Sequence, residues 1–226
     1  MTTDTAWQPL WDDVFAGRAW GKYPPEDLIR FVARNYYRHP DRASVKILEV
    51  GCGPGANLWY LAREGFSAFG IDGSDVAIAR ARARLASENL QADLKVGDIN
   101  ALDSLYPKAA FDAVVDVGCL VCFTAAGQKA ALGRIGGLLK PGGRVFSRLF
   151  GRGSWGDGDG TEIESGTFSD IVAGPLAGIG RVRFCSIDEV RSLFAGFEDV
   201  TIETARQSFE AGTREMVNLI VTARNA

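Results

Sequence analysis

The sequence predicts one α/β domain built on a Rossmann-like sheet with helices on both sides. Three observations lead to this fold class. Short β-branched runs alternate with segments of helical periodicity along most of the 226 residues. A buried-strand pattern runs directly into a glycine-rich turn after Val50. The chain is 46% hydrophobic and 23% charged, which is enough to bury a single sizeable core.

The N-terminal region, residues 1–42, is expected to form a helical cap. Pro24 and Pro25 should open a helix that runs to about residue 38, because proline suits the first turn of a helix. An aromatic-rich segment precedes this helix, and we expect it to pack over the edge or mouth of the sheet. Its aromatic residues are Trp7, Trp11, Phe15, Trp20 and Tyr23.

The core, residues 43–150, contains the regular alternation of strands and helices. Ser74 can cap a helix that ends near residue 89, and Lys140 to Gly143 should stop a later one. Three arginines on the first of these helices, Arg80, Arg82 and Arg84, fall at two-residue steps and are expected to be solvated. The strands predicted in this core are 45–50, 68–72, 94–96, 111–117 and 144–150.

Two further segments complete the chain. Residues 151–182 are glycine-rich and are expected to form a long lid loop. Residues 183–226 should form a helix and a strand pair, with strands at 200–204 and 216–223. Ser186 and Glu189 have the spacing of a capping box at the start of this helix.

The glycine-rich turn is the most informative motif. Glycines permit positive φ and a close approach of the backbone to a ligand, and the following helix offers free N–H groups at its N-terminus. The turn therefore suits a nucleotide-like ligand. Alone it is ambiguous, because Gly51, Gly53 and Ala56 also satisfy the pattern of dinucleotide-binding proteins.

Acidic residues at the ends of the next two predicted strands narrow the interpretation. Asp72 follows the second strand, where its carboxylate can accept hydrogen bonds from both hydroxyls of a ribose. Asp98 follows the third strand, and a Lys-Pro-Gly-Gly sequence precedes the fifth. These motifs predict a site for a nucleotide-like ligand that contains a ribose, at the carboxyl edge of the sheet.

This succession of motifs resembles the class I S-adenosylmethionine-dependent methyltransferases over roughly residues 45–223. The resemblance implies a seven-stranded sheet of order 3-2-1-4-5-7-6 in which the last strand is antiparallel. It also implies that residues 49–55 surround the methionine end of S-adenosylmethionine, that Asp72 holds the ribose, and that Asp98 and Ile99 contact adenine. The full set of expected cofactor contacts is Glu49, Gly51, Cys52, Gly53, Gly55, Asn57, Asp72, Gly73, Asp98, Ile99 and Gly118.

The expected reaction is methyl transfer to a small-molecule acceptor, leaving S-adenosylhomocysteine, with an oxygen, nitrogen, sulfur or carbon nucleophile. The residues expected to bind the acceptor are Trp20, Tyr23, Trp155 and Phe168. No catalytic residue stands out. If the acceptor needs a base, Asp116, Tyr23, a carboxylate of the lid or water are the options, because the only histidine, His39, lies at a helix end.

Two other classes of protein are compatible with these motifs. A nicotinamide-dependent oxidoreductase and a non-enzymatic nucleotide sensor remain alternatives. No metal site is expected, because Cys119 and Cys122 lack a second ligand pair, and Glu162 and Phe168 break the calcium-loop pattern. A net charge of −3 does not indicate a positively charged surface that would bind nucleic acid. Without an apolar span or a leader segment, we expect a cytoplasmic monomer or homodimer with free thiols.

Overall fold

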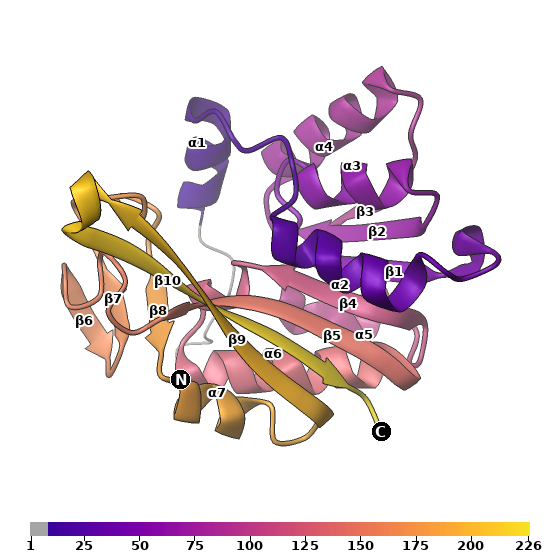
Figure 1. Cartoon of the computed structure of the whole chain (residues 1–226). Coiled ribbons are helices and arrows are strands. Elements are labelled where there is room, and N and C mark those ends of the chain that lie inside the picture. Colours follow the sequence, from indigo (N-terminus) through magenta and orange to yellow (C-terminus); the bar gives the residue numbers. More distant parts are fainter. Residues whose placement is uncertain (1–8) are drawn as a thin grey trace.

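A twisted sheet runs through the molecule and carries helices on both faces (Figure 1). This computed structural model describes residues 9–226, so the expectation for Trp7 lies outside the described residues. The five strands of the core lie parallel to one another in the order β3-β2-β1-β4-β5. Their bounds are β1 Lys46–Val50, β2 Ser67–Asp72, β3 Asp93–Val96, β4 Phe111–Val117 and β5 Leu139–Gly151.

The C-terminal strands extend the sheet beyond β5. β10 (Arg214–Arg224) pairs antiparallel with β5, and β9 (Glu198–Phe209) pairs antiparallel with β10. The predicted order 3-2-1-4-5-7-6, with an antiparallel last strand, is therefore confirmed for these seven strands. Both C-terminal strands are longer than predicted, because their polar, exposed ends continue the hairpin past its apolar centre.

Both faces of the central strands are buried, so each strand divides its apolar side chains between two cores. Ile47 packs with Leu28 and Phe146 on one face, whereas Leu48 packs on the other face with residues such as Ile135. Figure 1 shows α2, α3 and α4 on the first face and α5, α6 and α7 on the second. The helices span α2 Glu26–Tyr36, α3 Ala56–Arg63, α4 Asp75–Ser87, α5 Leu102–Leu105, α6 Ala125–Leu138 and α7 Ile187–Leu193.

The predicted helix ends agree with the structure where a side chain caps them. Ser74 accepts a hydrogen bond from the backbone N–H of Ala77 at the start of α4. Ser186 and Glu189 form the predicted capping box of α7. Pro25 precedes α2, and α6 ends one residue before β5, which takes up the Lys-Pro-Gly-Gly sequence. Short 3-10 turns occur at Arg42–Ser44, Ile99–Ala101, Leu120–Cys122 and Glu210–Gly212.

The N-terminal strap, which we define as residues 10–23, includes α1 (Leu10–Gly17) and crosses the carboxyl edge of the sheet beside α4 (Figure 1). The expectation that the α4 arginines are solvated is wrong for two of them. Arg80 donates to the carbonyl oxygens of Phe15 and Arg18, and Arg84 donates to that of Lys22. These half-buried guanidinium groups hold the strap by its backbone, a function that helical spacing alone does not reveal.

Residues 151–182 were expected to form a long loop, and this prediction is wrong. They contain the hairpin β6 (Thr161–Glu164) and β7 (Thr167–Ser169), and β7 pairs with β8 (Val182–Cys185). β8 joins the end of β5 in parallel. Together with side chains of β8 and β10, the insert forms an apolar cluster of Phe168, Ile171, Leu176, Ile179, Val182, Phe184 and Met216. The frequent glycines serve turns between these short strands, so composition alone suggested a loop.

None of the helices between residues 9 and 226 combines the length and the apolar character that crossing a membrane requires.

Candidate functional site

The pocket at the carboxyl edge of the sheet begins at the glycine turn between β1 and α3. Gly51, Gly53 and Gly55 all have positive φ, which lets the chain turn sharply from the strand into the helix. A Cβ atom on Gly51 would collide with Cβ and Sγ of Cys119, so the turn lies directly against the residues that follow β4. The backbone of this turn therefore forms one side of the pocket, with no side chain in the way.

Glu49 lies at the end of β1 and lines the pocket although it is only 2% exposed. Its Oε1 accepts a hydrogen bond from Nδ2 of Asn57 at 2.5 Å, while Oε2 is buried without a hydrogen-bond partner. Burial raises the pKa of this carboxyl well above its usual range, and the nearby Asp72 and Asp116 act in the same direction. A ligand cation or donor at this point would supply the missing partner for Oε2.

Asp72 lies at the end of β2, the strand beside β1, and also lines the pocket. Its Oδ2 accepts the N–H of Gly53 at 2.8 Å and its Oδ1 accepts the N–H of Ser74 at 2.9 Å. The carboxylate thereby ties the glycine turn to the start of α4. Burial raises its pKa above the ordinary value, whereas the two backbone hydrogen bonds lower it. Each oxygen can accept a further hydrogen bond, so the residue can also hold ligand hydroxyls.

The remaining walls come from the ends of β3 and β4. Asp98 accepts the N–H of Asn100 at 2.7 Å, which turns the chain so that Ile99 lines the pocket and is buried. Gly118 has a φ of +82° and leaves open space beside it. Apart from Gly55, every residue predicted to contact the cofactor lines this pocket.

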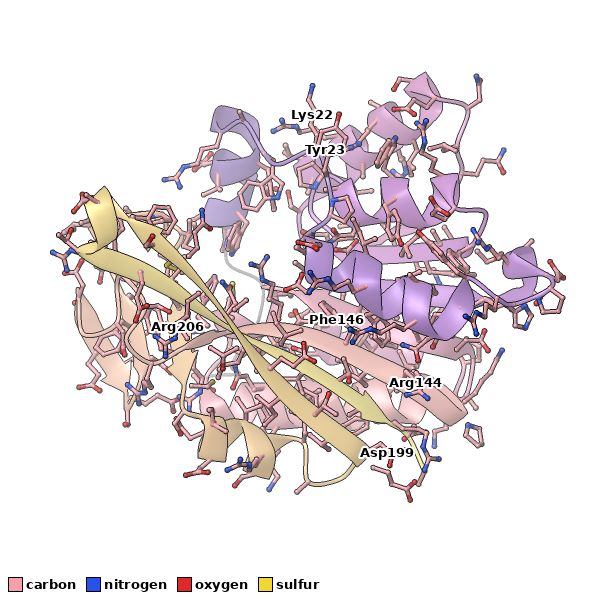
Figure 2. The ribbon with its side chains drawn as sticks, in the orientation of Figure 1. Lys22, Tyr23, Arg144, Phe146, Asp199 and Arg206 are labelled. Carbon is pink, nitrogen blue, oxygen red and sulfur yellow. The ribbon has the colours of Figure 1, made fainter. Side chains whose placement is uncertain are left out.

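An aromatic wall closes the pocket on the side of the strap. It consists of Trp11, Phe15 and Trp20, whose ring centroids lie 5.0 to 6.2 Å apart. A Cβ atom on Gly53 would lie 3.5 Å from Phe15, so this wall covers the glycine turn. Tyr23 also lines the pocket, but it is 72% exposed and stacks edge-on against Trp59. Figure 2 shows Lys22 and Tyr23 on the connection from α1 to α2.

Three predicted site residues lie elsewhere. Gly55 immediately precedes α3, and a Cβ atom there would lie 2.9 Å from Ala81, so this glycine permits contact between helices. Phe168 is only 7% exposed, inside the apolar cluster of the insert. Trp155 lines a separate surface hollow with Arg214, near the tip of the β9–β10 hairpin. Neither predicted acceptor residue therefore lines the pocket at the carboxyl edge of the sheet, because Phe168 is buried in the apolar cluster and Trp155 packs partly against it.

The prediction of Asp116 as a possible catalytic base does not agree with its position in the structure. It is 1% exposed and is not among the residues that line the pocket. Its Oδ1 accepts the N–H groups of Cys119 and Leu120, and its Oδ2 accepts the hydroxyl of Ser147. These bonds engage both oxygens, so the carboxylate has no direct path to a substrate. Of the two residues singled out by number, Tyr23 alone lies at the pocket.

Sequence reasoning missed several lining residues. Gly97 and Val117 precede predicted contacts, and Ala56 begins α3. Cys119 and Cys122, at which no metal site was expected, both line the pocket as free thiols. Their position follows from the turn after β4, which no spacing rule had singled out. Within residues 9–226, no group of three His, Cys, Asp or Glu side chains is arranged to hold a metal ion.

The donor set fits an adenosyl amino acid that carries a positive charge. Glu49 offers a buried, unpartnered carboxylate oxygen, and Asp72 offers acceptors for hydroxyl groups. Between them the glycine turn presents backbone alone, and Ile99 supplies an apolar surface for a planar base. S-adenosylmethionine combines all of these groups.

Comparisons with known proteins agree with this reading of the pocket. A family model described as a methyltransferase domain matches residues 47–143. The protein-L-isoaspartate O-methyltransferase of Methylorubrum extorquens is 32% identical over 181 residues, which cover 74% of this chain and 75% of that protein. An uncharacterized methyltransferase of Schizosaccharomyces pombe is 37% identical over 73 residues, or 32% of this chain and 49% of its own length. The chain thus spans about half the length of its fission-yeast relatives.

Solved structures resemble most of the chain. A methyltransferase from Methanosarcina mazei, described as S-adenosylmethionine-dependent, has a TM-score of 0.67 at 22% identity, covering 80% of this chain and 92% of that one. A protein studied for the conversion of a disulfide bond into a thioacetal group in echinomycin biosynthesis has a TM-score of 0.68 at 20% identity. The match covers 96% of this chain and 90% of the other. At these identities the likeness concerns the fold.

Proposed function

The chain belongs to the class I S-adenosylmethionine-dependent methyltransferases, and from this premise we propose that it transfers a methyl group to a small, largely apolar acceptor. One observation carries the proposal. A single continuous pocket joins the acidic residues that suit the cofactor to the aromatic wall of Trp11, Phe15 and Trp20. A cofactor and an acceptor can therefore share this pocket.

The residues around the glycine turn would hold the cofactor. Glu49 would accept a hydrogen bond from the ammonium group of its methionine part, and Asp72 would accept bonds from its ribose hydroxyls. Asp98 and Ile99 would border the adenine. When bound, S-adenosylmethionine supplies an activated methyl group on a positively charged sulfur. The acidic side chains also favour this cation over a neutral ligand.

The acceptor would lie against the aromatic wall and the turn after β4. There the lining side chains are Trp11, Val117, Cys119 and Cys122, none of which is charged. Burial raises the pKa of both thiols, so they stay protonated and act as small apolar surfaces. Large rings that exclude water and orient the acceptor can supply much of the rate enhancement of a displacement reaction.

The nucleophile of the acceptor is not fixed by this wall. Oxygen, nitrogen, sulfur and carbon nucleophiles all remain within the proposal. Curated relatives include ubiquinone biosynthesis O-methyltransferases from Nitrosococcus oceani and Azoarcus, which supports an oxygen acceptor as the first class to test. An acceptor hydroxyl would give its proton to the side chain of Tyr23 or to water. The carboxylate of Asp116 does not take this proton, because both of its oxygens already accept hydrogen bonds.

Calorimetric titration tests the cofactor half of the proposal. Saturable binding of S-adenosylmethionine and S-adenosylhomocysteine, with no heat from NAD, is expected. Binding of NAD alone would overturn the proposal in favour of an oxidoreductase.

A second assay tests turnover, because the fold also occurs in a protein described as a [4+2]-cyclase. Candidate acceptors are incubated with S-adenosylmethionine, and formation of S-adenosylhomocysteine is measured. Phenols, amines and thiols with an apolar body are expected to react faster than charged sugars or nucleotides. Cofactor binding without turnover of any acceptor would favour a sensor instead.

A further inference from the structure

Asp116 is a buried carboxylate that the proposed reaction does not use, and its contacts give it a different task. It is the second-last residue of β4, opposite Val50 on β1 and Ser147 on β5. Its Oδ1 accepts the N–H of Cys119 at 2.8 Å and that of Leu120 at 3.0 Å. Its Oδ2 accepts the hydroxyl of Ser147 at 2.5 Å. One side chain thus fixes the turn to both the strand that precedes it and the neighbouring strand.

The turn that Asp116 holds, residues 118–122, forms one wall of the pocket. Gly118, Cys119 and Cys122 all line it. Cys119 lies so close to Gly51 that a methyl group on this glycine would overlap with it. A displacement of the turn would therefore reach the glycine turn directly and change the space available to the cofactor.

Two other side chains hold the opposite, carbonyl end of the same turn. Nε2 of Gln128 on α6 donates to the carbonyl of Leu120 at 3.0 Å, and Nε of Arg181 donates to that of Cys122 at 2.6 Å. Asp116 supplies the side-chain acceptor for the N–H groups at its start. The turn is thus held at each end by buried or half-buried side chains from three separate segments.

We infer that Asp116 is a positioning residue, which holds turn 118–122 in the shape that binds the cofactor and takes no proton from the acceptor. This inference rests on the proposed function, because the cofactor is the ligand whose affinity it concerns.

The ionisation of Asp116 gives the inference a distinctive signature. Burial raises the pKa of this carboxyl from 3.8 to about 6, while its three hydrogen bonds act to lower it. The charged form makes stronger bonds to the two N–H groups than the protonated form does. Affinity for the cofactor should therefore fall as the pH drops through about 6. The titratable groups that interact with Asp116 are Glu49 from β1 and the thiols of Cys119 and Cys122.

The test uses calorimetry to measure the affinity of the whole chain for S-adenosylhomocysteine. The measurement is repeated from pH 5 to pH 8 in steps of about half a pH unit. Asp116→Asn keeps an oxygen for the two N–H groups and can donate to Ser147, but it cannot ionise. In the wild type, affinity should rise about threefold to tenfold across this range, whereas the rise should be clearly smaller in Asp116→Asn, where Glu49 alone of these two carboxyls can still ionise. Asp116→Ala should bind at least about tenfold more weakly than the wild type at pH 8.

Asp112→Asn is the matched control, because Asp112 lies on the same strand but away from the pocket. It should keep both the affinity and the pH step of the wild type. If the affinity of Asp116→Asn changes with pH as much as that of the wild type, the pH dependence belongs to Glu49 and the inference is overturned. If Asp116→Ala does not fold, the comparison of Asp116→Asn with the wild type decides alone. Absence of any binding by the wild type would instead overturn the proposed function.

Discussion

Release of the N-terminal strap offers a direct test of how the pocket is closed. Arg80 donates to two carbonyl groups of the strap, and Arg84 donates to a third while its guanidinium lies 5.1 Å from the Trp59 ring centroid. Replacing Arg80 by alanine removes charge-assisted bonds at a half-exposed site, which contribute about 1 to 1.5 kcal/mol in total. Since about 1.4 kcal/mol corresponds to a factor of ten, the open state of the strap should become roughly tenfold more populated.

Stopped-flow measurement of the dissociation of S-adenosylhomocysteine reports this change, because the strap carries the aromatic wall over the glycine turn. Arg80→Ala should dissociate about tenfold faster than the wild type, and the Arg80→Ala/Arg84→Ala pair about 30-fold to 100-fold faster. Arg82→Ala is the matched control, because Arg82 is on the same helix but donates to Leu94 on β3. Equal dissociation rates in Arg80→Ala and Arg82→Ala would refute the view that these contacts keep the pocket closed.

Three further outcomes are expected. Gly51→Ala should reduce the affinity for S-adenosylhomocysteine at least about 100-fold in calorimetry, because its φ is +65° and its new methyl group meets Cys119; normal affinity would show that the turn can shift. Asp72→Ala should weaken the binding of S-adenosylhomocysteine and lower the free energy of unfolding in urea by about 2 to 4 kcal/mol, because two buried N–H groups lose their acceptor. An unchanged midpoint of urea unfolding would show that Asp72 does not hold the glycine turn. Phe184→Ala should cost about 3 to 5 kcal/mol in the same assay, since its ring is fully buried in the insert, and a loss below about 1 kcal/mol would mean that the insert cluster is not tightly packed.

The parts of the site that follow from backbone chemistry could be predicted from the sequence. Gly51, Gly53 and Asp72 were identified because a sharp turn from a parallel strand and an acceptor at the next strand end impose specific residue types. The order of the seven main strands followed for a similar reason, through the family resemblance that these motifs carry. Such requirements are local, so a short stretch of sequence contains them.

The errors concern residues whose role depends on distant partners. Arg80 looked solvated on its helix, because the carbonyl groups it binds lie more than 60 residues earlier in the chain. Asp116 looked like a free carboxylate until Ser147 and the turn at Cys119 were placed beside it. Phe168 was expected to contact the acceptor because the glycine-rich composition around it suggested a loop, whereas it lies in a small sheet. Neither spacing nor composition records these tertiary contacts.

The insert between β5 and β8 leaves and rejoins the main sheet at nearly one point. The N–H of Arg152 donates to the carbonyl of Cys185 at 3.0 Å, so the two ends of the inserted segment are hydrogen-bonded to each other. A segment whose ends meet can change in length or sequence while the strands that it interrupts keep their positions. Arg181 reaches from this segment to the pocket turn at Cys122. Exchange of this segment between relatives is therefore a way to change how the pocket turn is supported while the strands of the main sheet keep their positions.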